Sequence, residues 1–310
     1  MQRTLICLET IGKIQMKKLT DFISFFLFRL VFGLFWLIPF RIIYLFSDLM
    51  YYKIYYLIRY RRKVVRDNLC RSFPDKSKKE IISIEKKYYR HFCDILVESF
   101  KAFGMTRQQF IKRYRILNPE LMEAYYKKGQ SVIVVLGHYN NWEWGSVASA
   151  QQMKHIPVGI YKPLSNIYFD HYIRKKREKS GTILAPLIHT GEYFERYRSK
   201  ICAFMLIADQ SPSTIRLAIW GKFLNQDTAF IHGPEKYSKL FNYPLIYAAI
   251  EKVKRGYYTI EFRSISDEPS KEKPHVLTHA YMQLLEQQIV RHPEYWLWSH
   301  RRWKHKKPQA

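Results

Sequence analysis

The chain has 310 residues, enough for one large domain or two small ones. It carries 52 Lys and Arg residues against 26 Asp and Glu, a formal net charge of +26, and 47% of its residues are hydrophobic. That hydrophobic content excludes an intrinsically disordered chain, and the 12 glycines exclude a collagen-like or linker-rich one. The charge predicts an anionic partner, with nucleic acid, an anionic membrane surface and an acidic substrate or carrier as the candidates.

The cysteines carry no metal or disulfide signature. Cys7, Cys70, Cys93 and Cys202 are scattered, and no two of them have the C-x2-C spacing of a zinc ribbon. We therefore expect a reducing compartment.

An apolar run near the N-terminus predicts a membrane anchor. Residues 22–40 contain one charge, Arg29, and as a helix they would be about 28 Å long, close to the ~30 Å of a bilayer core. The larger basic cluster follows the run, so the positive-inside rule places the remaining chain in the cytoplasm, at the inner membrane. A buried core helix is the alternative. Residues 1–18 are interpreted as an N-terminal extension and possibly an over-called start, because Met16 would be a natural start before the anchor.

The anchor segment, residues 19–60, is expected to continue as an aromatic juxtamembrane helix over residues 42–60. It ends in the basic run 59–63, which suits anionic lipid head groups at ~1 kcal/mol per basic residue. A solvated face beside a core helix is the alternative. After the turn at Pro74, apolar residues at helical spacing predict a helix over residues 77–103.

The pattern changes at residues 131–136, a short β-branched run that is typical of a strand buried on both faces. Gly137 permits a sharp exit, and Asn140 or Asn141 can cap a helix that begins near Trp142. His138 would then lie at the carboxyl edge of a parallel sheet, where open α/β sheets bind their ligands.

His138 and Glu143 form an H-x4-E pattern with a possible catalytic use. On one continuous helix their side chains would lie ~140° apart, but they can meet if His138 is in the turn and Glu143 in the first helical turn. A carboxylate on one ring nitrogen leaves the other nitrogen free to take a proton, as acyl transfer to an alcohol requires. The pattern also arises by chance, and a structural pair is the alternative.

From about Leu19 onward, the chain resembles the late acyltransferases of lipid A biosynthesis through several short sequence motifs in the same order. This is the lauroyl/myristoyl type within the lysophospholipid acyltransferase superfamily. These motifs are residues 62–69, Phe73-Pro74, Gly137-His138 to Glu143, Tyr161-Lys162-Pro163 with Arg177 and Gly181, Ala208-Asp209-Gln210, Gly233-Pro234-Glu235 and residues 295–304. The chain departs from the commoner pattern at His232 and Lys236, which concerns the identity of the acceptor more than the chemistry.

The resemblance implies transfer of an acyl chain from acyl carrier protein to a hydroxyl of a phosphorylated glycolipid at the inner face of the inner membrane. It implies His138 as general base and Glu143 as its partner, without a metal or a covalent acyl-enzyme. Arg177 matches a family arginine expected near the phosphorylated acceptor, and Asp209 falls in the matching acidic motif. Both are predicted to bind substrate.

The rest of the chain predicts an α/β fold with a central, mostly parallel sheet flanked by helices, in an acyltransferase domain over residues 61–310. Short apolar runs at residues 156–161, 182–185, 201–208 and 244–250 are expected strands, and a turn at residues 254–257 leads into another at 258–265. No G-x-G-x-x-G or Walker loop is present, so the sequence gives no support for a nucleotide cofactor.

Two further features of the sequence could indicate other functions. His275 and His279 have a spacing that can hold zinc, but no third ligand is evident. The basic, aromatic tail could contact nucleic acid; beside an apolar run of near-bilayer length, we interpret Arg301 and Arg302 as contacts for phosphate or an acidic carrier. The alternatives are an acyltransferase for a lysophospholipid or amino-acid lipid, and a non-enzymatic basic protein that binds membrane or nucleic acid.

Overall fold

The computed structural model describes residues 19–29, 33, 35–102 and 104–308. A seven-stranded sheet has the strand order β1-β9-β8-β2-β5-β3-β4, and a separate antiparallel hairpin is formed by β6 and β7. All neighbours in the large sheet run parallel except β8 and β9. The strands are β1 (Tyr114–Ile116), β2 (Val132–Leu136), β3 (Ile156–Tyr161), β4 (Ile183–Pro186), β5 (Cys202–Ile207), β6 (Ile219–Phe223), β7 (Gln226–Phe230), β8 (Leu245–Lys254) and β9 (Tyr257–Ser266).

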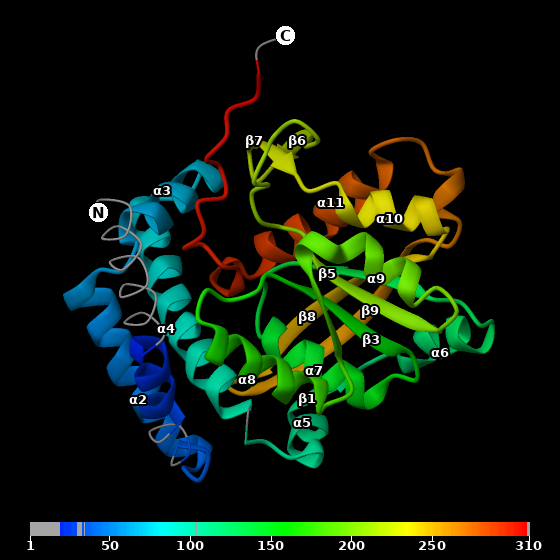
Figure 1. Cartoon of the computed structure of the whole chain (residues 1–310). Helices are drawn as coiled ribbons and strands as arrows, with labels where there is room; N and C mark the ends of the chain where they lie inside the picture. The colour runs from blue at the N-terminus through cyan, green and yellow to red at the C-terminus, as the bar shows by residue number, and fades with distance from the viewer. Residues whose placement is uncertain (1–18, 30–32, 34, 103, 309–310) are drawn as a thin grey trace, which may run out of the picture.

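Helices cover both faces of the large sheet (Figure 1). The α-helices are α2 (Phe40–Tyr52), α3 (Arg62–Ser72), α4 (Lys78–Ala102), α5 (Arg107–Arg113), α6 (Pro119–Lys127), α7 (Trp142–Gln152), α8 (Ile167–Glu178), α9 (Thr190–Arg196), α10 (Gly233–Phe241) and α11 (Val276–Arg291). A π-helical segment, Lys53–Ile58, continues α2, and short 3-10 turns are formed by Leu187–His189, Pro269–Lys271 and Pro293–Tyr295. The predicted α/β class and mostly parallel sheet are confirmed.

The central strand β2 shows why the sheet has two buried faces. All five of its residues are buried, and they alternate between two apolar clusters. Ile133 and Val135 face the side covered by α9, α10 and α11, whereas Val134 and Leu136 face the side covered by α5, α6 and α7. A strand buried on both faces needs an unbroken apolar run, which is the pattern that predicted it.

The N-terminal segments pack beside the sheet domain rather than under it. In Figure 1 the blue α2 runs alongside α4 at one flank of the domain. Residues 19–29 are helical, and Phe25 and Phe28 contact the aromatic side chains of α8. The predicted helices over residues 42–60 and 77–103 are confirmed as α2 with its π-helical extension and as α4.

The predicted anchor helix over residues 22–40 is not supported. The chain leaves the helix before Pro39, whose extended backbone (ψ 148°) precedes the start of α2 at Phe40. Proline cannot continue an incoming helix, which accounts for the break. No helix in the described part of the chain is long and apolar enough to cross a membrane. Residues 30–32 and 34 of that run, and the predicted extension 1–18, lie outside the described residues.

Candidate active site

The turn after β2 carries His138 at the carboxyl edge of the sheet. A Cβ atom on Gly137 would lie 2.8 Å from both methyl carbons of Leu285 and 3.3 Å from Oδ2 of Asp209, so glycine allows this close approach. Asn141 then begins α7, because its Oδ1 accepts a hydrogen bond from the Trp144 amide at 2.9 Å. The predicted cap and helix start are confirmed.

Asp209 meets His138 because β2 and β5 are parallel neighbours. Leu136 and Ile207, the last residues of these strands, are paired in the ladder, and His138 and Asp209 each follow two residues later. Nδ1 of His138 lies 2.6 Å from Oδ1 of Asp209, and the His138 amide donates to Oδ2 at 2.8 Å. Trp296 Nε1 also donates to Oδ2, at 2.7 Å. This carboxylate therefore fixes both the backbone and the ring of His138.

The Asp209 carboxylate is buried, with 2% of the residue exposed. Burial alone would raise its pKa, but attraction to the His138 ring and hydrogen bonds from His138 and Trp296 lower the pKa below its ordinary value. Asp209 is therefore ionised at neutral pH. An ionised carboxylate against Nδ1 requires a proton on that nitrogen and leaves the lone pair on Nε2.

The side chain of His138 is partly exposed, and its Nε2 contacts one neighbouring side chain. The His138 side chain is 16% exposed, and its ring lies edge-on to Trp142, with 5.1 Å between centroids. The Gln210 side-chain amide lies 3.1 Å from Nε2. With the proton on Nδ1, Nε2 accepts this hydrogen bond, so Gln210 occupies the direction from which a substrate proton would arrive.

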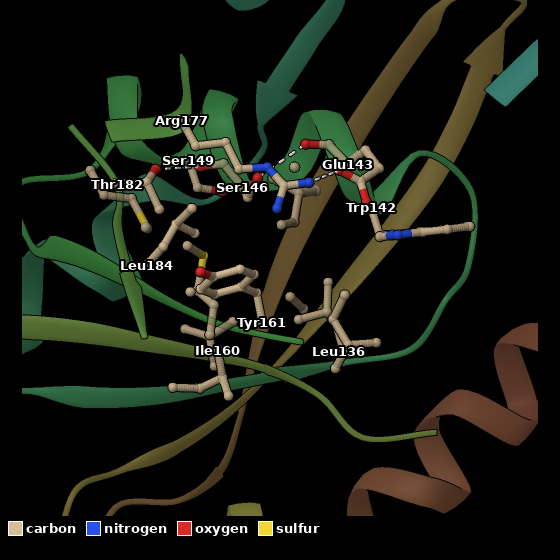
Figure 2. A pocket seen from close by; sticks show the side chains of 18 of the residues that line it. Leu136, Trp142, Glu143, Ser146, Ser149, Ile160, Tyr161, Arg177, Thr182 and Leu184 are labelled. Atoms are coloured by element: carbon tan, nitrogen blue, oxygen red, sulfur yellow. Dashed lines mark hydrogen bonds and ion pairs between the residues drawn. The ribbon is translucent and has the colours of Figure 1, made fainter. Parts of the chain in front are cut away.

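Glu143 is directed to Arg177 instead of the His138 ring. Its carboxylate forms an ion pair and hydrogen bond with the Arg177 guanidinium near the end of α8. Figure 2 shows this pair at the edge of a pocket, above Leu136 and Tyr161. The expected orientation of His138 by Glu143 is thus corrected: Asp209 makes that contact. A guanidinium is charged at neutral pH and competes for a carboxylate better than a neutral imidazole does.

The two C-terminal arginines differ in exposure. Arg301 is exposed, as a contact for phosphate or a carrier protein requires. Arg302 is 2% exposed, its Nη1 donates to the Ala229 carbonyl at 2.8 Å, and burial lowers its pKa to about 10. The sequence predicted Arg302 as a contact for phosphate or an acidic carrier, but in this structure its guanidinium lies inward, over the ring of Phe230.

The described residues contain no group of three or more His, Cys, Asp or Glu placed to hold a metal ion. His279 lies on α11 with Nδ1 2.8 Å from the His275 carbonyl and Nε2 3.4 Å from that of Trp220. Each of its ring nitrogens thus lies beside a backbone carbonyl.

Comparison with known protein families shows where the chain belongs. The family of bacterial lipid A biosynthesis acyltransferases matches residues 9–305, nearly the whole chain. The chain belongs to this family. It is therefore an acyltransferase of lipid A biosynthesis, with a glycolipid acceptor. A comparison with curated proteins gave no match.

In this acyltransferase, sequence reasoning predicted Asp209 as a substrate-binding residue and not as the partner of His138, and it gave no role to Gln210 or Trp296. A signal for Asp209 was present, because His138 and Asp209 each stand two residues beyond an apolar strand. The contact of Trp296 follows from the fold alone, since its segment pairs with Tyr139 across the sheet edge.

A second buried carboxylate, that of Glu98, binds the turn after β2 through Asn141. Glu98 of α4 accepts hydrogen bonds from Asn141 Nδ2 at 2.7 Å and from the hydroxyls of Tyr44 and Tyr258, each at 2.8 Å. Burial, with the nearby charge of Asp94, raises its pKa to about 7, although these hydrogen bonds oppose the shift. The residue that caps α7 is therefore held by a group that titrates near neutral pH.

We predict that Glu98→Gln changes how stability depends on pH. The folded state binds the Glu98 proton more tightly than the unfolded state, so this stabilisation is present below about pH 4.5 and is lost as pH rises to about 7. The free energy of unfolding of wild type should therefore decrease by on the order of 3 kcal/mol over this range, and that of the variant should not. Urea unfolding at several pH values measures the difference, with Glu120→Gln on the exposed start of α6 as control. An unchanged difference between wild type and Glu98→Gln from pH 5 to 8 would contradict this prediction.

Proposed function

We propose that the enzyme transfers a fatty acyl chain from acyl carrier protein to a hydroxyl of a lipid A precursor, with His138 as the general base. The observation that carries the proposal is the 2.6 Å contact between His138 Nδ1 and Asp209, which leaves the lone pair on Nε2. This is the geometry of a base held in one tautomer by a buried carboxylate. The family match supports the acyl transfer and the lipid A acceptor.

In the proposed reaction, the acceptor hydroxyl replaces the Gln210 amide at Nε2 and gives its proton to that nitrogen. The hydroxyl oxygen forms a bond to the thioester carbonyl carbon, whose oxygen takes the negative charge of a tetrahedral intermediate. Collapse breaks the carbon–sulfur bond, and the leaving thiolate takes the proton back from Nε2. Asp209 stabilises the imidazolium between these steps without accepting the proton.

The Glu143–Arg177 pair is proposed to position the acceptor rather than to orient the base. A guanidinium has five N–H donors, so a pair with one carboxylate leaves donors for a phosphate. Arg177 is 22% exposed and stands at the edge of the pocket beside α7. Exposed Arg301 and the net charge of +26 supply further attraction for a phosphorylated lipid and an acidic carrier protein.

Three substitutions test these roles. His138→Ala should reduce kcat by about 10²–10⁴ through loss of the general base, without unfolding the protein. Asp209→Asn should cause a comparable loss, because the amide no longer favours the proton on Nδ1. Glu143→Gln should raise KM for the acceptor more than it lowers kcat, because it releases Arg177.

The measurement is mass spectrometry of lipid products from purified enzyme, acyl carrier protein thioesters and a lipid A precursor. Circular dichroism shows whether each variant is folded. Wild-type rates from folded His138→Ala would refute the proposed base. A loss of kcat in Glu143→Gln larger than in Asp209→Asn would restore the original pairing of Glu143 with His138.

We also propose that the enzyme meets its lipid acceptor at the cytoplasmic face of the inner membrane, through an apolar surface on its N-terminal helices. Outward-facing α2 side chains recur at helical spacing: Leu45, Phe46 and Leu49 are 67%, 49% and 54% exposed. The opposite face of α2 packs on α4 through Ile43 and Ser47. Contiguous exposed apolar surface beside exposed Arg41 and Lys53 suits an anionic bilayer.

Vesicle binding tests this surface. The variant Leu45→Ser/Phe46→Ser/Leu49→Ser should lose most of its binding to vesicles that contain anionic lipid, because it removes apolar area that would enter the bilayer. Leu187→Ser/Ile188→Ser is the matched control, since these residues are 58% and 83% exposed in the turn after β4. Flotation assays measure both; equal binding of the triple variant and wild type would contradict the proposal.

A further inference from the structure

A polar cleft lies between α2, α4 and the end of β8. It holds about 650 Å³, within the ~300–1,000 Å³ usual for ligand sites, and it shares no lining residue with the pocket of Figure 2. Basic side chains in its lining outnumber acidic ones: Arg90, Lys252, Lys254 and Arg255, against Asp48 and Asp94. This surplus of positive charge predicts an anionic ligand.

Both carboxylates of the cleft are already paired with cations. The Arg255 guanidinium lies 2.7 Å from Asp48 and 2.6 Å from Asp94. The Lys252 ammonium lies 3.6 Å from Asp94. The two carboxylates therefore balance the charges of Arg255 and Lys252 and leave the other two basic residues of the cleft uncompensated.

These two residues are Arg90 and Lys254, and both are exposed. Neither forms an ion pair within the described part of the chain. The Arg90 guanidinium lies over the ring of Tyr51 and the Lys254 ammonium over that of Tyr257, at 5.1 and 4.6 Å from the centroids. A cation on an aromatic ring keeps N–H donors for another partner. A phosphate monoester, with a charge of about −1.5 to −2 at neutral pH, matches the two uncompensated charges.

Two less exposed groups of the lining have hydrogen bonds left to make. The Lys252 side chain is 13% exposed, and its Nζ contacts His91 Nδ1 at 3.2 Å besides Asp94. An ammonium has three N–H donors, so one is left for a ligand. Tyr51 is 2% exposed, and its buried hydroxyl has no hydrogen-bond partner among the described residues. Buried polar groups are normally paired, so an unpaired hydroxyl in the lining of a cleft points to a ligand.

The cleft adjoins the apolar surface of α2. Tyr52, which lines the cleft, follows Leu45 and Leu49 at helical spacing and is 55% exposed. Val253 at the end of β8 also lines the cleft and is 61% exposed. A ligand with a phosphate in the cleft can therefore lay hydrocarbon chains against the exposed face of α2.

We propose that this cleft binds the phosphate group of an anionic phospholipid of the bilayer. The choice of a phosphate rests on the cleft itself, and the choice of a bilayer lipid rests on the apolar α2 surface proposed above. Free phosphate has no use for that surface. The proposed acceptor is also a phosphorylated lipid, but Arg177 and Arg301, outside this cleft, are the groups proposed for it.

The test is calorimetric titration of the full-length enzyme with dihexanoyl phosphatidic acid, which is monomeric in solution and forms no bilayer. Wild type should bind it saturably. Arg90→Gln and Lys254→Gln should each weaken the affinity by roughly tenfold, because each removes a charge-assisted hydrogen bond. Dihexanoyl phosphatidylcholine, whose head group has no net charge, should not bind. Acyl transfer in detergent should be unchanged in both variants.

Lys86→Gln is the matched control, because Lys86 is exposed one helical turn before Arg90 on α4 and does not line the cleft. Its affinity should equal that of wild type. Equal affinities of wild type and both cleft variants, or equal binding of phosphatidylcholine, would overturn the inference. Inorganic phosphate that binds as tightly as phosphatidic acid would overturn the lipid in favour of free phosphate.

The remaining outcomes separate this cleft from the proposals on which it builds. A higher KM for the lipid A precursor in Arg90→Gln and Lys254→Gln, with an unchanged affinity for phosphatidic acid, would overturn the inference in favour of the acceptor. Equal flotation of wild type and Leu45→Ser/Phe46→Ser/Leu49→Ser would contradict the α2 surface, and with it the bilayer as the source of the phosphate. Absence of wild-type acyl transfer would contradict the proposed reaction and leaves the lipid titration as the test of the cleft.

Discussion

A carboxylate that is 2% exposed is stable only where hydrogen-bond donors replace its water, and Asp209 obtains its donors from His138 and Trp296. The carboxylate and its donors come from three parts of the chain: His138 follows β2, Asp209 follows β5, and Trp296 lies in the C-terminal segment. The parallel pairing of β2 with β5 brings the first two together. The cost of burying one charge is therefore offset by the same contacts that orient the His138 ring, as the proposed proton transfer requires.

The site is also connected to the N-terminal helices through buried polar groups. Glu98 on α4 holds Asn141 from one side and accepts from Tyr44 of α2 and Tyr258 of β9. The outer face of α2 is the apolar surface proposed to meet the membrane. The helix that would contact lipid and the turn that carries His138 thus share one buried carboxylate, which holds the site at a defined position relative to that surface.

Local patterns predicted the strands and the turn after β2 well, because burial on two faces and helix capping depend on neighbouring residues. The apolar runs around β2, β3 and β5, and the cap at Asn141, follow from their own sequences. The partner of His138 does not, because Glu143 is near in sequence whereas Asp209 becomes near only when β5 is placed beside β2. Arg302 shows the same limit: its charge predicted a surface contact, but the fold buries it.

The helix break before α2 shows a different limit. Hydropathy predicted an apolar helix through residue 40, but the chain leaves the helix before Pro39. Residues 19–29 contact α8, whereas α2, which begins at Phe40, packs on α4. Their inner faces stabilise the fold, and their outer faces leave apolar surface exposed. One apolar run can therefore serve packing and lipid contact at once.

The tautomer of His138 tests the central claim most directly. ¹⁵N NMR of protein labelled in its imidazole rings, with the His138 signals identified by their absence in His138→Gln, shows which ring nitrogen carries the proton in the neutral ring. The account predicts a proton on Nδ1 and none on Nε2 in wild type, and loss of this preference in Asp209→Asn. A proton on Nε2 in wild type, or a preference that Asp209→Asn leaves unchanged, would contradict it.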